Sequence, residues 1–299
     1  MNSNLKYFWA ILGLILVLIF GVFFSLPDQN FHLIFCDVGQ GDAILAIKGK
    51  NQILIDAGPG EKVLGCLSNH IPFWDKTLEL MILTHPEADH GGGLPSVLER
   101  YKVLQFVSNS LVVETGLFQK IREEILRQKI PVYSPKAGDK IKIGNLEIEI
   151  LFPLEKMGEE IVWEKEGSPQ VLGVSVFGGN LNETAIVSLL KYGDFYSLLT
   201  ADIGVKQEQE ILKVLDRVQP CQVLKVAHHG SKYSSSREFL EKFSPSLAVI
   251  SVGAANRYGH PSFEVLERLR NLGIKIKRTD LDGEIEVISD GKRWWLKKR

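Results

Sequence analysis

The pattern of apolar and polar positions divides the chain into a uniformly apolar N-terminal segment and a longer part of alternating short elements. Runs rich in β-branched and aromatic residues predict strands, and apolar residues at three- and four-residue spacing predict helices. The predicted strands are 31–38, 43–48, 52–56, 78–83, 103–107, 140–143, 146–152, 185–190, 195–200, 222–227, 247–252, 274–278 and 284–288. The predicted helices are 94–101, 116–128, 206–218, 236–243 and 262–272, and 157–180 is predicted to be a long surface loop. This order favours an α/β fold in which two sheets pack face to face with helices outside.

Residues 8–26 form an uncharged and almost wholly apolar segment. As a helix with a rise of about 1.5 Å per residue, it would extend roughly 28 Å, close to the hydrocarbon thickness of a bilayer. It lacks the small-residue exit that a cleaved signal peptide usually has. Lys6 before it and Asp28 after it favour an N-terminus inside and a domain outside the cytoplasm. We therefore expect one transmembrane helix in an anchor of residues 1–27, and a single extracytoplasmic domain at 28–299.

Net charge and cysteine content narrow the possible classes of protein and of metal site. The formal net charge of −1 gives no global basic field for a nucleic-acid partner, although a local basic patch remains open. Cys36, Cys66 and Cys221 are odd in number and widely spaced. They fit neither a disulfide framework nor a cysteine-rich zinc site, so we expect buried free thiols.

The stretch HPEADHGGG at 85–93 carries the strongest chemical signal. It places His85, Asp89 and His90 within six residues, directly after an apolar run that predicts a strand. Imidazole and carboxylate groups are ligands that divalent zinc, manganese and iron accept. The alternative is a surface turn with two solvated histidines. The three following glycines favour the metal site, because they allow a tight backbone turn at the cost of helix propensity.

Polar residues follow several other predicted strands. Asp56 ends the strand at 52–56, Asp202 follows 195–200, His228 and His229 follow 222–227, and His260 comes after 247–252. In layered α/β folds the loops after strands share one rim, so these side chains are expected to gather there. Taken alone, Asp202 could equally cap a helix that begins near residue 204.

Three further motifs narrow the class of protein. These are FCDVGQGDA at 35–43, HHGS at 228–231 and YGHP at 258–261. Together with the histidine motif they resemble the extracytoplasmic hydrolase domain of ComEC-type DNA-uptake proteins, over roughly residues 30–290. The resemblance implies a metallo-β-lactamase-like αββα sandwich, here preceded by the predicted transmembrane helix. ComEC-type proteins also carry a many-helix channel, so this chain resembles the hydrolase module alone, working beside a separate DNA-uptake channel protein.

The resemblance assigns roles to residues of this sequence. Metal ligands would be His85, Asp89, His90, Asp202 and one of the late histidines, assigned here to His228 with His229 as the alternative. Asp56 would brace the site. Glu87 stands where the family has a histidine, Asn182 stands where another metal histidine is usual, and His260 lies on the late motif. Further metal ligands, or residues that hold the ligands in place, would be Asp56, Glu87, Asn182 and His260. We expect zinc or manganese, as one ion or two of unequal affinity.

The resemblance also implies a reaction. A divalent metal with an open position lowers the pKa of a bound water to about 7. Asp89 would orient that water, and the unligated histidine of the pair, His229 in this assignment, would donate a proton to the leaving group. Ser231 would hold a phosphate oxygen. Asp37 and Asp42 are better explained by a tight turn than by catalysis.

Charged and aromatic residues near the late motifs bear on the substrate. Four basic residues would contact phosphates and two tyrosines would stack bases, and the alternative is a solvated loop. These residues are Lys225, Lys232, Arg237, Arg257, Tyr233 and Tyr258. The basic end at 292–299 could contact an anionic membrane or nucleic acid, but Trp294 and Leu296 alternate like a last edge strand. The expected function is a membrane-tethered phosphodiesterase or nuclease acting on DNA. The alternatives are a hydrolase of another ester, of phosphorylcholine or lactone type, and a non-catalytic binding module.

Overall fold

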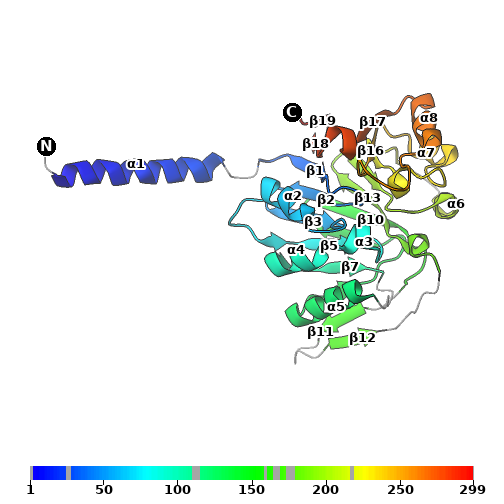
Figure 1. Ribbon diagram of the computed structural model, residues 1–299, viewed down its shortest axis with the longest axis horizontal. Coiled ribbons are helices and arrows are strands. Elements are labelled where there is room, and N and C mark those ends of the chain that lie inside the picture. Colours follow the sequence, from blue (N-terminus) through cyan, green and yellow to red (C-terminus); the bar gives the residue numbers. More distant parts are fainter. Residues whose placement is uncertain are drawn as a thin grey trace.

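The computed structural model describes residues 3–24, 28–109, 115–157, 160–163, 169–172, 179–215 and 219–298. Within this part of the chain, two large sheets and the helices outside them form the body of the molecule, and helix α1 (Ser3–Phe24) projects away from it (Figure 1). The layers are helix, sheet, sheet and helix, which confirms the predicted αββα arrangement.

The first sheet is formed mainly by the N-terminal half of the domain, and strands from the C-terminus complete it. Hydrogen bonding runs in the order β12-β11-β8-β7-β5-β3-β2-β1-β18-β19. The strands are β12 (Pro169–Leu172), β11 (Glu160–Trp163), β8 (Val132–Tyr133), β7 (Phe106–Ser108), β5 (Leu80–Leu83), β3 (Asn51–Ile55), β2 (Ile44–Lys48), β1 (Phe31–Phe35), β18 (Ile285–Ser289) and β19 (Trp294–Leu296).

The second sheet has the order β17-β16-β15-β14-β13-β10-β9. Its strands are β17 (Lys275–Arg278), β16 (Leu247–Ile250), β15 (Val223–Lys225), β14 (Phe195–Leu199), β13 (Val187–Tyr192), β10 (Leu146–Phe152) and β9 (Lys140–Ile143). Strands β14, β15, β16 and β17 are parallel. In the first sheet, β3, β5 and β7 are parallel as well. Parallel strands present their carboxyl ends at one edge, so the loops after β3, β5, β14 and β15 can meet at a single place.

Three apolar clusters hold these layers together. Successive side chains of β1 point to opposite faces of the sheet. Those of Phe31, Leu33 and Phe35 therefore lie in the cluster between the sheets, while that of Ile34 faces the outer helices. The first sheet is covered by α2 (Lys62–His70), α4 (Leu94–Arg100) and α5 (Gly116–Gln128). The second is covered by α6 (Val205–Val214), α7 (Arg237–Phe243) and α8 (Phe263–Asn271). Shorter elements are β4 (Thr77–Leu78), α3 (Ala88–Gly91), β6 (Lys102–Val103), η1 (Leu181–Thr184), η2 (Ala227–Gly230) and α9 (Thr279–Asp282).

The outer helices begin at residues that the sequence makes suitable for capping. The Ser236 hydroxyl accepts a hydrogen bond from the backbone N–H of Phe239 at the start of α7, and Ser262 accepts one from Val265 at the start of α8. Such caps satisfy a backbone donor that the helix leaves unpaired. Each of the two helices starts within one residue of the start that the sequence predicts.

The segment predicted to be a membrane anchor is helical, as α1. In the described part of the chain, however, no helix is both long and apolar enough to cross a membrane. The transmembrane part of the predicted fold is therefore not supported.

Two expectations were wrong. The stretch 157–180 is not simply a loop, because β11 and β12 pair with each other inside it and extend the first sheet. Cys36 and Cys66 are not free thiols but form a disulfide across 30 positions of sequence. Helix α2, which the sequence analysis did not identify, brings Cys66 beside the residue that follows β1. Cys221 is a buried free cysteine, as expected.

Candidate metal centre

The candidate centre lies where loops of the two sheets meet. Asp56 directly follows β3, His85 follows β5 after one residue, and Asp89 and His90 lie in α3. From the second sheet, Asp202 follows β14, and His229 lies in η2, which follows β15 after one residue. The parallel neighbours β14 and β15 therefore deliver two of these side chains side by side, facing those of the first sheet.

Two of the three glycines after His90 serve close packing of the backbone. A Cβ atom on Gly92 would lie 2.4 Å from the carbonyl oxygen of Pro59, and one on Gly93 would lie 2.3 Å from that of Ala57. Both distances are far below van der Waals contact. The motif needs glycine because α3 packs directly onto the turn after β3, which also carries Asp56.

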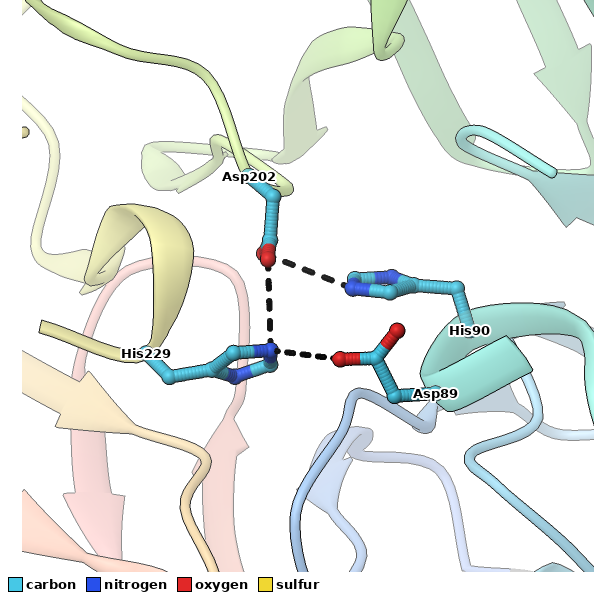
Figure 2. A group of neighbouring side chains, drawn as sticks. All are labelled: Asp89, His90, Asp202 and His229. Atoms are coloured by element: carbon cyan, nitrogen blue, oxygen red, sulfur yellow. Dashed lines mark ion pairs between the residues drawn. The ribbon is translucent and has the colours of Figure 1, made fainter. Parts of the chain in front are cut away.

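Four side chains point toward one another at this place (Figure 2). Nε2 of His229 lies 3.3 Å from Oδ2 of Asp89 and 3.2 Å from Oδ2 of Asp202. Nε2 of His90 lies 3.4 Å from Oδ1 of Asp202. Two imidazole nitrogens and two carboxylates thus converge, and one ligand atom from each residue lies within 4.8 Å of the others. His90, Asp202 and His229 are buried, and Asp89 is partly exposed.

Asp56 fixes the orientation of His90. Its Oδ2 lies 2.7 Å from Nδ1 of His90, so the ring presents Nε2 to the cluster. Asp56 also accepts hydrogen bonds from the backbone N–H and the hydroxyl of Thr84, at 2.8 and 2.7 Å. On the other sheet, Nδ1 of His229 is 2.8 Å from the carbonyl oxygen of Ser251, which orients that ring in the same way. Contacts of this kind hold metal-binding histidines in position.

The electrostatics of the cluster follow from its opposite charges. Burial lowers the pKa of His229, but the charge of Asp202 and the contacts with Asp202 and Asp89 outweigh it and raise the pKa to about 9. Burial raises the pKa of Asp89, yet the contact with His229 and the charge of His90 bring it down to about 2. The pKa of Asp202 also lies well below its ordinary value, because nearby His229, His90 and Lys225 overcome its burial. Asp89 and Asp202 are therefore anionic at neutral pH, as metal ligands must be.

The donor set fits a divalent cation. Nε2 of His90 and Nε2 of His229 are buried and make no regular hydrogen bond within the described residues, although both face carboxylate oxygens. A buried polar atom without a partner is costly, and a cation among these atoms would satisfy both nitrogens at once. Two imidazoles with two carboxylates suit zinc or manganese.

Two of the other predicted residues, His85 and Glu87, lie beside the cluster. His85 is fully buried, its ring centroid is 4.1 Å from that of His90, and its Nε2 has no hydrogen-bond partner in the part of the chain described. Burial and the neighbouring His90 hold its pKa well below the ordinary value, so it is neutral with a free lone pair. Elsewhere, in η1, Oδ1 of Asn182 is also buried without a hydrogen-bond partner among the described residues. Burial and the charge of Asp89 raise the pKa of Glu87.

The late motifs are arranged differently from the sequence-based assignment. His228 was assigned as the ligand, but its Nε2 lies 4.0 Å from Asp202 and its side chain is 34% exposed, whereas His229 is in the cluster. The backbone explains why His229, and not His228, lies in the cluster. Both residues have left-handed conformations, with φ of 48° and 53°, which turn the two rings in different directions. His260 is half-buried, with its ring centroid 5.7 Å from that of His228. Ser231 is buried, and its hydroxyl oxygen accepts a weak hydrogen bond from the N–H of Tyr233.

Sequence reasoning missed two residues of the centre. Asp42, which was interpreted as part of a turn, is buried, and its Oδ1 lies 3.6 Å from Nδ1 of His229. Lys225, which was placed on a phosphate-contacting rim, is fully buried and forms a short ion pair with Asp42. The rim assignment of Lys225 was therefore wrong. Its position in the sequence could have indicated that Lys225 is buried, because it is the one charged residue in the apolar run 223–227.

Comparison with known proteins agrees with this geometry. The family model "Metallo-beta-lactamase superfamily" matches residues 36–254. The chain is 30% identical to ComE operon protein 3 of Bacillus subtilis over 84% of its own length and 32% of that protein. It is 27% identical to competence protein ComA of Neisseria gonorrhoeae over 88% of its own length and 33% of that protein. It thus spans about a third of these relatives.

Among solved structures, the metallo-beta-lactamase fold protein YhfI from Bacillus subtilis superposes with a TM-score of 0.52 at 10% identity. That comparison covers 89% of this chain and 100% of YhfI, and at this identity it shows the fold alone. The family match, the competence relatives and the fold agree. The chain belongs to the metallo-beta-lactamase superfamily and is related to competence proteins of the ComEC type.

Proposed function

We propose that the chain is a metal-dependent phosphodiesterase that cleaves DNA. The observation that carries this proposal is the convergence of Asp89, His90, Asp202 and His229 at the edge where loops of both sheets meet. These four residues would hold one divalent cation, zinc or manganese. His85, with its unpartnered nitrogen, would form a weaker second position together with Glu87.

A divalent cation held there would supply Lewis acidity and make a bound water more acidic. The chain's own residues would do the rest. Asp89 is the partly exposed member of the cluster, so its carboxylate can reach both the cation and a water at the open side. Its low pKa keeps it able to accept a hydrogen bond from that water.

His228 replaces His229 as the proposed proton-transfer residue. It lies at the exposed side of the cluster, and burial lowers its pKa, which leaves a neutral imidazole at pH 7. A neutral imidazole can take a proton from water and later give it to a leaving oxygen. His260 is its neighbour and would orient its ring. The proposed contact of Ser231 with a phosphate oxygen receives little support, because this hydroxyl is buried in its own turn.

The surface beside His228 supports an anionic, base-containing substrate. Tyr233 and Tyr258 are each 71% exposed, and Lys232 and Arg257 are exposed beside them. Stacking on tyrosine and contact with basic groups are the two means by which proteins bind single-stranded nucleic acid without reading its sequence. Arg237 contributes less, because it pairs with Glu241 on its own helix. The resemblance to ComEC-type DNA-uptake proteins, in line with the competence relatives, favours DNA that passes to or from a separate uptake channel.

An extracytoplasmic position is part of the proposal. The Cys36–Cys66 disulfide supports it, because disulfides persist mainly in oxidising compartments. The competence relatives support association with the membrane. Anchoring through residues 8–26 stays a prediction of the sequence.

The test is turnover by the purified chain with added Mn²⁺ or Zn²⁺ on labelled single-stranded DNA, a phosphorylcholine ester and a lactone. We expect metal-dependent cleavage of DNA, and its loss in Asp89→Asn. Cleavage of only one of the small esters would support the other class of hydrolase. Absence of metal binding and of all turnover would support a binding module. Either result would refute the proposed nuclease.

A further inference from the structure

A buried lysine lies beneath the candidate metal centre. Lys225 ends β15 and is fully buried. Its ammonium contacts three groups: it forms a short ion pair with Oδ2 of Asp42, it lies 3.3 Å from Oδ1 of Asp202, and it donates a 2.9 Å hydrogen bond to the carbonyl oxygen of Ala201. All three N–H donors of the ammonium therefore have an acceptor.

These contacts join the two sheets. Asp42 belongs to the loop between β1 and β2 of the first sheet, whereas Ala201 and Asp202 follow β14 of the second. The loop of Asp42 is itself fixed, since its N–H donates to the carbonyl oxygen of Asp89 and its carbonyl oxygen accepts from the N–H of Gly58. Lys225 thus ties Asp202 to a rigid part of the opposite sheet.

The contacts also determine how Asp202 meets the other ligands. Its Oδ2 faces His229 at 3.2 Å, and its Oδ1 faces both His90 and Lys225, at 3.4 and 3.3 Å. The ammonium therefore restrains the carboxylate at one oxygen and leaves the other directed at the cluster. Removing the ammonium would free the carboxylate to rotate and would leave Asp42 as an uncompensated buried charge.

We propose that Lys225 is a positioning residue of the metal centre, which holds the Asp202 carboxylate in the orientation that binds the cation, and that Asp42 holds Lys225. This inference rests on the proposed metal centre and adds to it a group that does not contact the cation. The competing explanation is that Lys225 only balances the charge of Asp42 and contributes nothing to metal binding.

Calorimetric titration of the metal-free chain with Mn²⁺ separates the two explanations. Lys225→Met keeps most of the side-chain volume without the charge, and Asp42→Asn keeps the shape of its partner. We expect each substitution to weaken Mn²⁺ binding by about 10- to 100-fold, as outer-shell substitutions typically do. The double variant removes the pair without leaving a lone buried charge, so its unfolding midpoint should recover while its Mn²⁺ affinity stays low. Lys213→Met, at an exposed position on α6, is the control and should bind Mn²⁺ like the unaltered chain.

Wild-type affinity in Lys225→Met, or recovery of wild-type affinity in the double variant, would overturn the inference. If Lys225→Met does not fold, Asp42→Asn decides, and unchanged Mn²⁺ affinity in that variant overturns it equally. The proposed function fails differently, because in that case the unaltered chain itself does not bind Mn²⁺ or does not cleave DNA.

Discussion

Nε2 of His229 lies 3.2 Å from Oδ2 of Asp202, and this contact joins the loops that follow the neighbouring strands β14 and β15. It brings His229, rather than its neighbour, into the candidate cluster. The two strands are parallel, with Leu199 opposite Lys225, so the loops that follow them start at the same edge of the sheet. The two histidines of the pair therefore have different expected functions.

Exchanging each histidine for glutamine should separate those functions. His229→Gln should weaken Mn²⁺ binding by more than about 100-fold, because losing a ligand costs more than losing an outer-shell contact. His228→Gln should bind Mn²⁺ normally and lower kcat, by about 100-fold if proton transfer is lost. Titration calorimetry and single-turnover rates measure the two effects. The opposite pattern would restore the assignment of His228 as the ligand.

Binding of the cation should stabilise the folded chain. The ligands come from both sheets, so the unfolded chain offers no comparable site. At a free Mn²⁺ concentration about 100 times Kd, the free energy of unfolding should rise by about 2.7 kcal/mol. Denaturant unfolding with and without a chelator measures this gain, and Asp202→Asn should lose most of it. A gain of equal size in that variant would place the cation elsewhere.

The disulfide should contribute strongly to stability. Cys36 and Cys66 are 30 positions apart, and closing a loop of that length stabilises the folded state by about 3–4 kcal/mol in the chain-entropy model. We expect the variant with Ser at both positions to lose about that much in denaturant unfolding. Dithiothreitol should destabilise the unaltered chain equally and should leave the variant unaffected. If reduction has no effect on the unaltered chain, the disulfide does not form.

A histidine on β1 that is not part of the candidate centre should make stability depend on pH. Burial lowers the pKa of His32, but hydrogen bonds with Glu286 and Asp28 outweigh it and raise the pKa above the ordinary value of 6.5. The protonated form is thus favoured by folding. Its stabilisation is present in full below pH 6.5 and is lost as the pH rises through the raised pKa. His32→Gln should therefore lose more stability at pH 6 than at pH 9, and an equal loss at both would contradict this account.

The sequence was sufficient for the features that depend on local pattern. The cluster of His85, Asp89 and His90 is visible because it occupies six residues, and the layers follow from the periodicity of strands and helices. The burial of Lys225 depends on pairing with Asp42, which is distant in the sequence and comes from the other sheet. The choice of His229 over His228 depends on two left-handed backbone conformations. The disulfide depends on where α2 lies, and Gly65 and Asn69 weaken the helical signal there.

The most direct test of the central claim is anomalous X-ray scattering from a crystal of the chain grown with Mn²⁺. The account predicts a strong anomalous peak between Nε2 of His90, Nε2 of His229 and the carboxylates of Asp89 and Asp202, with a weaker peak or none beside His85. A peak coordinated by His228 instead of His229, or the absence of any peak at this edge of the sheets, would contradict it.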